Sequence, residues 1–138
     1  MLRYLFVYGT LRKTQDGRLH PYLKKRAVFI DHASLPGKLY QIGCYPGAVP
    51  EPAASGFRVH GEVYRLLDPA RLLPILDEYE ECTGHFPQPH EYRRVSASVT
   101  LADGWPLKAW VYWFRHSTAG LRQISSGDYL DYRNRNES

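Results

Sequence analysis

The sequence predicts a β-rich α+β fold, because strand-like segments are frequent along it and one segment shows helical spacing. Its 138 residues include 11 Tyr, 5 Phe and 3 Trp, whose large apolar side chains favour β-strands. The hydrophobic fraction of 43% and the charged fraction of 23% are ordinary for a globular protein and exclude wholesale disorder. A chain of this length usually forms one core, so we expect residues 1–138 to be a single domain.

Short runs of apolar and aromatic residues, bounded by Gly and Pro, predict the strands. The first run ends at Gly9, as expected for a buried strand that enters a turn. Asp103 and Gly104 form a hairpin signal between the last two runs. The run at 57–66 alternates, but each of its faces mixes apolar and polar residues, so alternation does not identify the inward face. The expected strands are residues 2–8, 28–32, 38–42, 57–66, 92–101 and 107–114.

A helix is expected from Asp68 and Pro69 onward, because Asp is a good N-cap and Pro is favoured at the first helical position. Pro74 predicts either a separate first turn or a kinked helix, since a proline removes a backbone hydrogen bond. The helix is expected to end at residues 82–84, where a Gly is available. The positions that repeat at helical spacing are Leu72, Leu73, Leu76 and Tyr79.

The remaining segments are expected to be turns and loops. A weak pattern at 20–26 predicts one more short helix, and residues 127–130 of the polar tail are expected to fold back onto the body. Polar composition, or clustered Pro and Gly, predicts an exposed loop at 12–17, a turn at 35–37 and an irregular loop at 45–50.

Charge and cysteine usage limit the classes of partner. The net charge of +4 comes from scattered basic residues, so we expect no nucleic-acid partner. No apolar stretch approaches the roughly 18 residues of a membrane span, and the first residues are strand-like, so we expect a cytoplasmic protein without a membrane partner. Cys44 and Cys82 form no CxxC motif and the six histidines show no ligand spacing, which predicts structural thiols and no metal.

Several motifs follow one another across nearly the whole chain: FVYGTLR at 6–12, YPGAVP at 45–50, VHGEVY at 59–64, LDEYE at 76–80, YRR at 92–94 and SGDYL at 126–130. Together they resemble the γ-glutamylcyclotransferase-like superfamily, which includes γ-glutamylamine cyclotransferase and small bacterial homologues. The opening turn motif alone would be unspecific, but its occurrence with the others in order is fairly specific.

The resemblance implies a compact mixed β-barrel with short flanking helices, without cofactor or metal. It also implies an enzyme that cyclises the γ-glutamyl group of a γ-glutamyl amine or amino acid to 5-oxoproline and releases the amine. The general acid/base of the family corresponds to Glu80 of the LDEYE motif. The substrate-binding residues implied are Tyr8, Gly9, Thr10 and Leu11 of the opening turn, with Tyr45, Pro46 and Tyr92 as further contacts.

Other interpretations of the same residues stay open. Without the resemblance, Glu78 and Glu81 are as plausible as Glu80, and each would be a solvated surface residue. A non-catalytic protein that binds a small metabolite on the same fold is the alternative function, and a nucleic-acid-binding barrel ranks third. The expected partner is a small γ-glutamyl substrate, bound by a monomer or weak homo-oligomer. The amine leaving group is not specified; it would contact the loops at 14–20 and 85–90.

Overall fold

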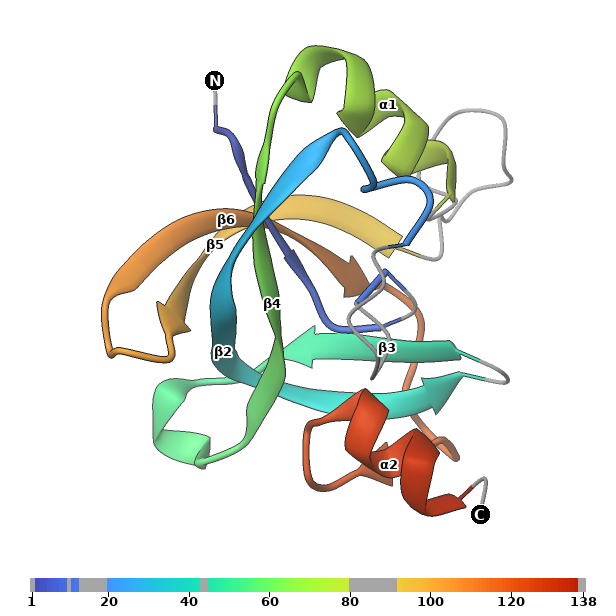
Figure 1. Cartoon of the computed structure of the whole chain (residues 1–138). Helices are drawn as coiled ribbons and strands as arrows, with labels where there is room; N and C mark the ends of the chain where they lie inside the picture. The colour runs from blue at the N-terminus through green and yellow to red at the C-terminus, as the bar shows by residue number, and fades with distance from the viewer. Residues whose placement is uncertain (1, 10, 13–19, 43–44, 80–91, 137–138) are drawn as a thin grey trace.

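Five β-strands close into a mixed barrel in the computed structural model, which describes residues 2–9, 11–12, 20–42, 45–79 and 92–136 (Figure 1). The ring runs β2, β4, β1, β6 and β5, and pairing of β5 with β2 closes it. Only the β1–β6 pair of this ring is parallel, which makes the barrel mixed and confirms the predicted fold class. The strands are β1 (Tyr4–Val7), β2 (Ala27–Ile42), β3 (Tyr45–Pro50), β4 (Arg58–Leu66), β5 (Tyr92–Leu101), β6 (Pro106–Phe114) and β7 (Arg122–Ile124).

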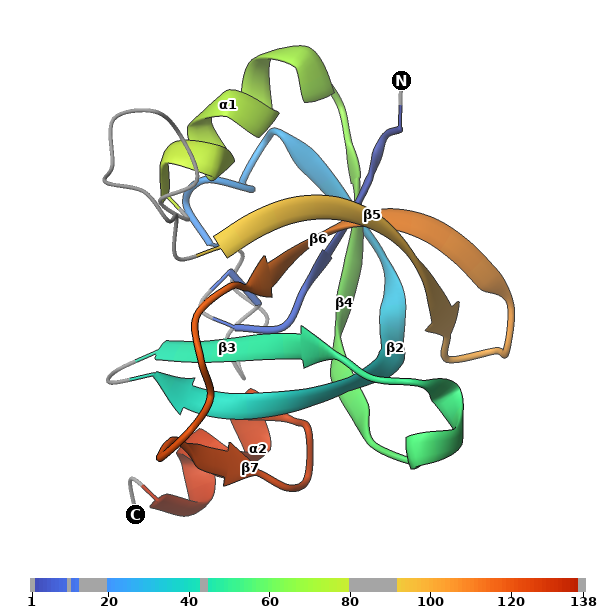
Figure 2. The same ribbon diagram turned by 180° about the vertical axis from the view of Figure 1, so that it is seen from behind.

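Two α-helices lie at opposite ends of the described part of the barrel. Helix α1 (Pro69–Tyr79) covers one end, and α2 (Tyr129–Asn136) lies beside β2 and β7 at the other (Figures 1 and 2). A single 3-10 turn, η1 (Ala53–Ser55), connects β3 to β4. Neither α-helix is long and apolar enough to cross a membrane.

Strand β2 contradicts the prediction of two strands joined by a turn at 35–37. It is continuous over sixteen residues, and it changes partner in the middle: residues 27–36 pair with β4, and residues 37–42 pair with β3. Gly37 lies at this change, where its N–H donates to the Phe57 carbonyl at 3.1 Å. A Cβ there would be 2.9 Å from the Val49 carbonyl oxygen, so the glycine permits close approach of two backbones rather than a chain reversal.

Residues 45–50 form strand β3 rather than the predicted irregular loop. Its prolines are tolerated because β3 is the end strand of the sheet path and pairs with β2 along one side. An edge strand needs ladder hydrogen bonds on that side alone, so a missing proline N–H is not costly there.

The helix predicted at 20–26 is also wrong, because the chain forms consecutive turns. The His20 carbonyl accepts the N–H groups of Leu23 and Lys24 at 2.9 and 3.0 Å, as in a first helical turn. Lys25 then adopts a φ of 64°, a left-handed conformation that ends the helical path.

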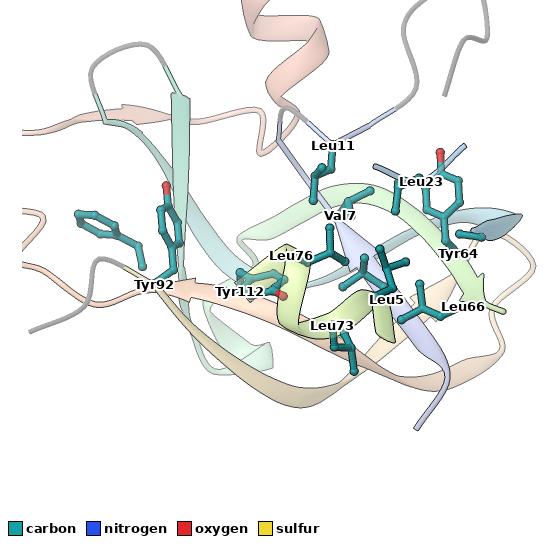
Figure 3. Packing of buried hydrophobic residues seen from close by; sticks show 13 residues of the cluster. Leu5, Val7, Leu11, Leu23, Tyr64, Leu66, Leu73, Leu76, Tyr92 and Tyr112 are labelled. Atoms are coloured by element: carbon teal, nitrogen blue, oxygen red, sulfur yellow. The ribbon is translucent and has the colours of Figure 1, made fainter. Parts of the chain in front are cut away.

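Helix α1 begins at Pro69 as predicted, with the Asp68 carbonyl accepting the N–H groups of Arg71 and Leu72. It continues as one helix through Pro74, which is exposed, so a separate first turn is excluded. The predicted end at 82–84 lies outside the described residues. The helix buries Leu72, Leu73 and Leu76 in the cluster that contains Leu5 and Val7. Figure 3 shows Leu73 and Leu76 beside Leu5 of β1.

Strands β4, β5 and β6 confirm the sequence predictions for these segments. Gly104 has a φ of 94° in the hairpin turn, as the Asp-Gly signal requires. The tail folds back as expected: Tyr129 is buried, and the Gly127 carbonyl accepts the His60 N–H at 2.8 Å. Strand β7 and helix α2 within this tail were not predicted.

Candidate active site

A tight turn follows β1 and contains the first group of predicted site residues. The Arg12 N–H donates to the Gly9 carbonyl at 3.1 Å and closes the turn. The N–H groups of Gly9 and Leu11 make no hydrogen bond to any other described residue. Thr10, between them, lies outside the described residues. Backbone N–H groups that converge in such a turn are suited to bind a carboxylate or an oxyanion.

Tyr8 is fixed at the base of this turn by two hydrogen bonds. Its hydroxyl donates to the Tyr112 carbonyl at 2.6 Å and accepts the Ala48 N–H at 3.2 Å. The side chain is 6% exposed, so it joins β1 to both β6 and β3 from the interior. Tyr8 therefore holds the turn in place against two neighbouring strands.

Pro46 brings together three of the four separate segments predicted to form the site. A Cβ on Gly9 would lie 2.9 Å from Pro46 Cγ, so the turn can pack this closely only with glycine. The Tyr92 hydroxyl donates to the Pro46 carbonyl at 2.7 Å. The ring of Tyr45 lies 6.3 Å from that of Tyr92, centroid to centroid. The predicted contacts Gly9, Tyr45, Pro46 and Tyr92 are thus neighbours, although they come from β3, β5 and the turn after β1.

The Leu11 side chain points away from the turn into the hydrophobic core. It is 3% exposed and packs in the cluster that contains Val7, Leu23 and Leu76 (Figure 3). Only its backbone remains for a ligand, so Leu11 anchors the turn to the core rather than lining the site with its side chain.

Glu80, the predicted general acid/base, lies outside the described residues. Helix α1 ends one position earlier, and its last described side chains include Asp77. The Asp77 carboxylate accepts hydrogen bonds from Arg94 and from the Tyr112 hydroxyl, each at 2.7 Å to Oδ1. The end of α1 is therefore attached to β5 and β6. Asp77, Arg94 and Tyr112 had no predicted role, although the first two occur in the LDEYE and YRR motifs.

A buried ion cluster directly behind the turn also escaped the sequence analysis. Arg12 was expected in an exposed loop, but it is 8% exposed and its Nε lies 3.2 Å from Glu62 Oε2. Its Nη1 lies 2.9 Å from Asp128 Oδ1, at the start of α2. Glu62 is 2% exposed and also accepts the Tyr64 hydroxyl at 2.8 Å. These residues occur in three of the motifs, but their burial and pairing depend on contacts between distant segments.

The described residues hold no metal-binding cluster, and their tyrosines are largely shielded from solvent. No three of their His, Cys, Asp or Glu side chains gather closely enough to hold a metal ion. Every tyrosine whose burial is described is buried or half-buried. Trp105, in the β5–β6 turn, is 70% exposed.

Comparison with known proteins gives consistent matches over nearly the whole chain. A family profile described as gamma-glutamyl cyclotransferase, AIG2-like, matches residues 5–131. The gamma-glutamylcyclotransferase family protein YtfP of Escherichia coli K12 is 36% identical over 127 residues, covering 92% of this chain and 96% of that protein. An uncharacterized Pyrococcus horikoshii protein, PH0828, has a TM-score of 0.67 at 27% identity, with 98% and 96% of the two chains covered. A mouse AIG2-like protein has a TM-score of 0.68 at 23% identity, with 93% and 88% covered, and supports the fold alone.

Proposed function

We propose that the chain, which belongs to the AIG2-like γ-glutamylcyclotransferase family, converts a γ-glutamyl amine or γ-glutamyl amino acid into 5-oxoproline and the free amine. The observation that carries the proposal is the turn after β1. There the N–H groups of Gly9 and Leu11 have no hydrogen-bond partner among the described residues, and Pro46 packs against the turn.

The turn suits the charge that this reaction develops. The α-amine nitrogen of the substrate attacks the γ-carbonyl carbon, and the carbonyl oxygen becomes negatively charged in the tetrahedral intermediate. The N–H groups of Gly9 and Leu11 would donate either to this oxygen or to the α-carboxylate of the glutamyl group. Because attack is intramolecular, holding the γ-glutamyl chain folded would itself lower the barrier by several kcal/mol.

Glu80 would transfer the proton that the reaction moves. The α-amine is an ammonium at neutral pH, so it must lose a proton before it attacks, and the departing nitrogen must gain one as the C–N bond breaks. After attack, the α-amine nitrogen loses a second proton as the lactam N–H forms. One carboxylate can pass that proton to the departing nitrogen, and the proton lost before attack returns through solvent to give the product ammonium, so the reaction balances without a cofactor. Support for Glu80 comes from its place in the LDEYE motif, three residues after Asp77.

The test is mass-spectrometric detection of 5-oxoproline after incubation with a panel of γ-glutamyl compounds. The panel contains glutathione, γ-glutamyl amino acids and γ-glutamyl-ε-lysine, which share the glutamyl end and differ in the leaving amine. Glu80→Gln should lower the rate about 100- to 10,000-fold, the usual range for loss of a general acid/base. Glu78→Gln is the matched control, because Glu78 is an exposed carboxylate two positions earlier on α1.

The outcomes separate the competing interpretations. Release by the wild type that Glu80→Gln abolishes and Glu78→Gln preserves would establish the reaction, the acid/base and the leaving group together. Release that survives in Glu80→Gln would keep the enzyme but refute the assignment of Glu80. No release from any compound, with the fold verified by circular dichroism, would favour a non-catalytic metabolite-binding protein.

A further inference from the structure

Asp77 is the meeting point of side chains from three elements at the end of α1. Arg94 of β5 donates to it in a bidentate fashion, from Nε to Oδ1 at 2.7 Å and from Nη2 to Oδ2 at 3.1 Å. Tyr112 of β6 donates its hydroxyl to the same Oδ1 at 2.7 Å. The Asp77 and Arg94 side chains are 19% and 23% exposed, so this pair is largely shielded from solvent. Bidentate, charge-assisted bonds of this kind fix orientation as well as distance.

Arg94 is itself held rigidly from its other side. Its guanidinium carbon lies 4.3 Å from the centre of the Trp110 ring, within the range of a cation–π contact. The Trp110 indole N–H donates to the Leu2 carbonyl at 3.1 Å, which fixes the orientation of that ring. The Asp77 carboxylate is therefore bound to a guanidinium group whose own position is restrained by Trp110.

Tyr112 connects this cluster to the candidate substrate-binding turn. Its hydroxyl binds Asp77 on α1, whereas its backbone carbonyl accepts the Tyr8 hydroxyl at 2.6 Å. Tyr8 is the residue immediately before Gly9 of the turn. One residue of β6 thus forms hydrogen bonds with both parts of the site: the helix that precedes Glu80 and the turn that would bind the glutamyl group.

We propose that Asp77 and Tyr112 are positioning residues that set the end of α1, which Glu80 follows directly in the sequence, relative to the Tyr8–Gly9 turn. This inference rests on the proposed cyclotransferase function. A carboxylate that must reach both the attacking and the leaving nitrogen requires a fixed distance from the substrate, because a displacement of about 1 Å can cost roughly 100-fold in rate. A merely structural ion pair would alter stability without a selective effect on the chemical step.

The decisive variant is Tyr112→Phe, which removes only the hydroxyl and keeps the buried ring. We expect kcat for the best γ-glutamyl substrate to fall roughly 10- to 100-fold, with KM changed less than about twofold. Asp77→Asn should likewise lower kcat and leave KM nearly unchanged. Tyr4→Phe is the matched control: it removes a hydroxyl from a half-buried tyrosine at the start of β1, for which no hydrogen bond is found among the described residues.

A second readout is hydrogen exchange of the backbone amides at 76–79, which should become faster in Tyr112→Phe and stay unchanged in Tyr4→Phe. Unchanged kcat in both Tyr112→Phe and Asp77→Asn, in proteins with wild-type melting temperatures, would overturn the positioning role and leave the cyclotransferase function intact. A parallel loss of kcat and melting temperature, with KM also raised, would mark the cluster as structural only. Absence of turnover by the wild type would instead refute the proposed function, and this inference with it.

Discussion

Replacing Arg12 by methionine tests whether the buried ion cluster behind the turn stabilises the fold. The substitution preserves an unbranched side chain of similar length but removes the guanidinium. Glu62 would then keep its carboxylate at 2% exposure without the cation that lies 3.2 Å from it. Asp128 would also lose a partner at 2.9 Å, but its side chain is 33% exposed and water can replace that bond.

The expected cost therefore arises mainly from Glu62. Breaking a buried ion pair by removing one partner typically costs 3–5 kcal/mol, because the remaining charge is left uncompensated. A chain of this length loses roughly 3–5 °C of melting temperature per kcal/mol, so Arg12→Met should melt about 9–25 °C lower. Since small domains have total stabilities of about 5–15 kcal/mol, this loss would be a large fraction of the whole.

The assay is urea unfolding followed by tryptophan fluorescence and circular dichroism, with the free energy of unfolding taken from linear extrapolation. The double variant Arg12→Met with Glu62→Gln should recover at least half of the lost stability, because the amide is uncharged and can still accept the Tyr64 hydroxyl. The control is Arg71→Met. Arg71 lies 4.0 Å from Asp68 in an exposed pair, so its loss should cost no more than about 0.5 kcal/mol.

Two results would refute this reasoning. A loss in Arg12→Met no larger than that in Arg71→Met would mean that burial does not make the pair important. A double variant as unstable as the single one would mean that the Glu62 charge, after the loss of Arg12, is not the cause, and that lost packing of the long Arg12 side chain is the better explanation.

Two further predictions concern glycine and histidine positions. Gly127→Ala should destabilise the protein more than Gly56→Ala in thermal melts: both glycines have positive φ, 70° and 78°, but only a Cβ on Gly127 would overlap the Arg58 carbonyl. Burial lowers the pKa of His20 below 6.5, so the folded state binds its proton less readily than the unfolded state and stability falls as pH drops below that value. His20→Asn, which can still accept the Tyr22 N–H, should flatten this dependence in urea midpoints compared at about pH 5 and pH 7.5.

Local sequence signals predicted the elements whose formation depends on neighbouring residues. The strand before Gly9, the β5–β6 hairpin with its Asp-Gly turn and the start of α1 at Asp68-Pro69 all follow short-range rules. The barrel itself was predicted only through the resemblance to the family, because ring closure depends on pairing between β2 and β5, which no local pattern specifies.

The candidate site likewise contains residues that the sequence predicted and residues that only the fold revealed. The turn residues and Pro46 were found because they form contiguous motifs, and the structure brings Gly9 and Pro46 together. The ion cluster was not found, because its hydrogen bonds join Arg12 to residues 50 and 116 positions away. A charged residue in a polar segment is usually exposed, and only the fold determines that this one is buried.

Two of the segments that broke the local rules, residues 35–37 and 45–50, help to assemble the candidate site. Pro36-Gly37 looks like a turn, but a turn there would end β2 before it could pair with β3. Because β2 continues past Gly37, its pairing with β3 carries Pro46 to the turn after β1, where the Pro46 carbonyl also accepts the Tyr92 hydroxyl. The cost of placing prolines in a strand is small at a sheet edge, and the gain is a rigid partner for Gly9. Departures from local propensity are expected where a protein builds a functional or strained site, and here two of them place Pro46 against the candidate turn.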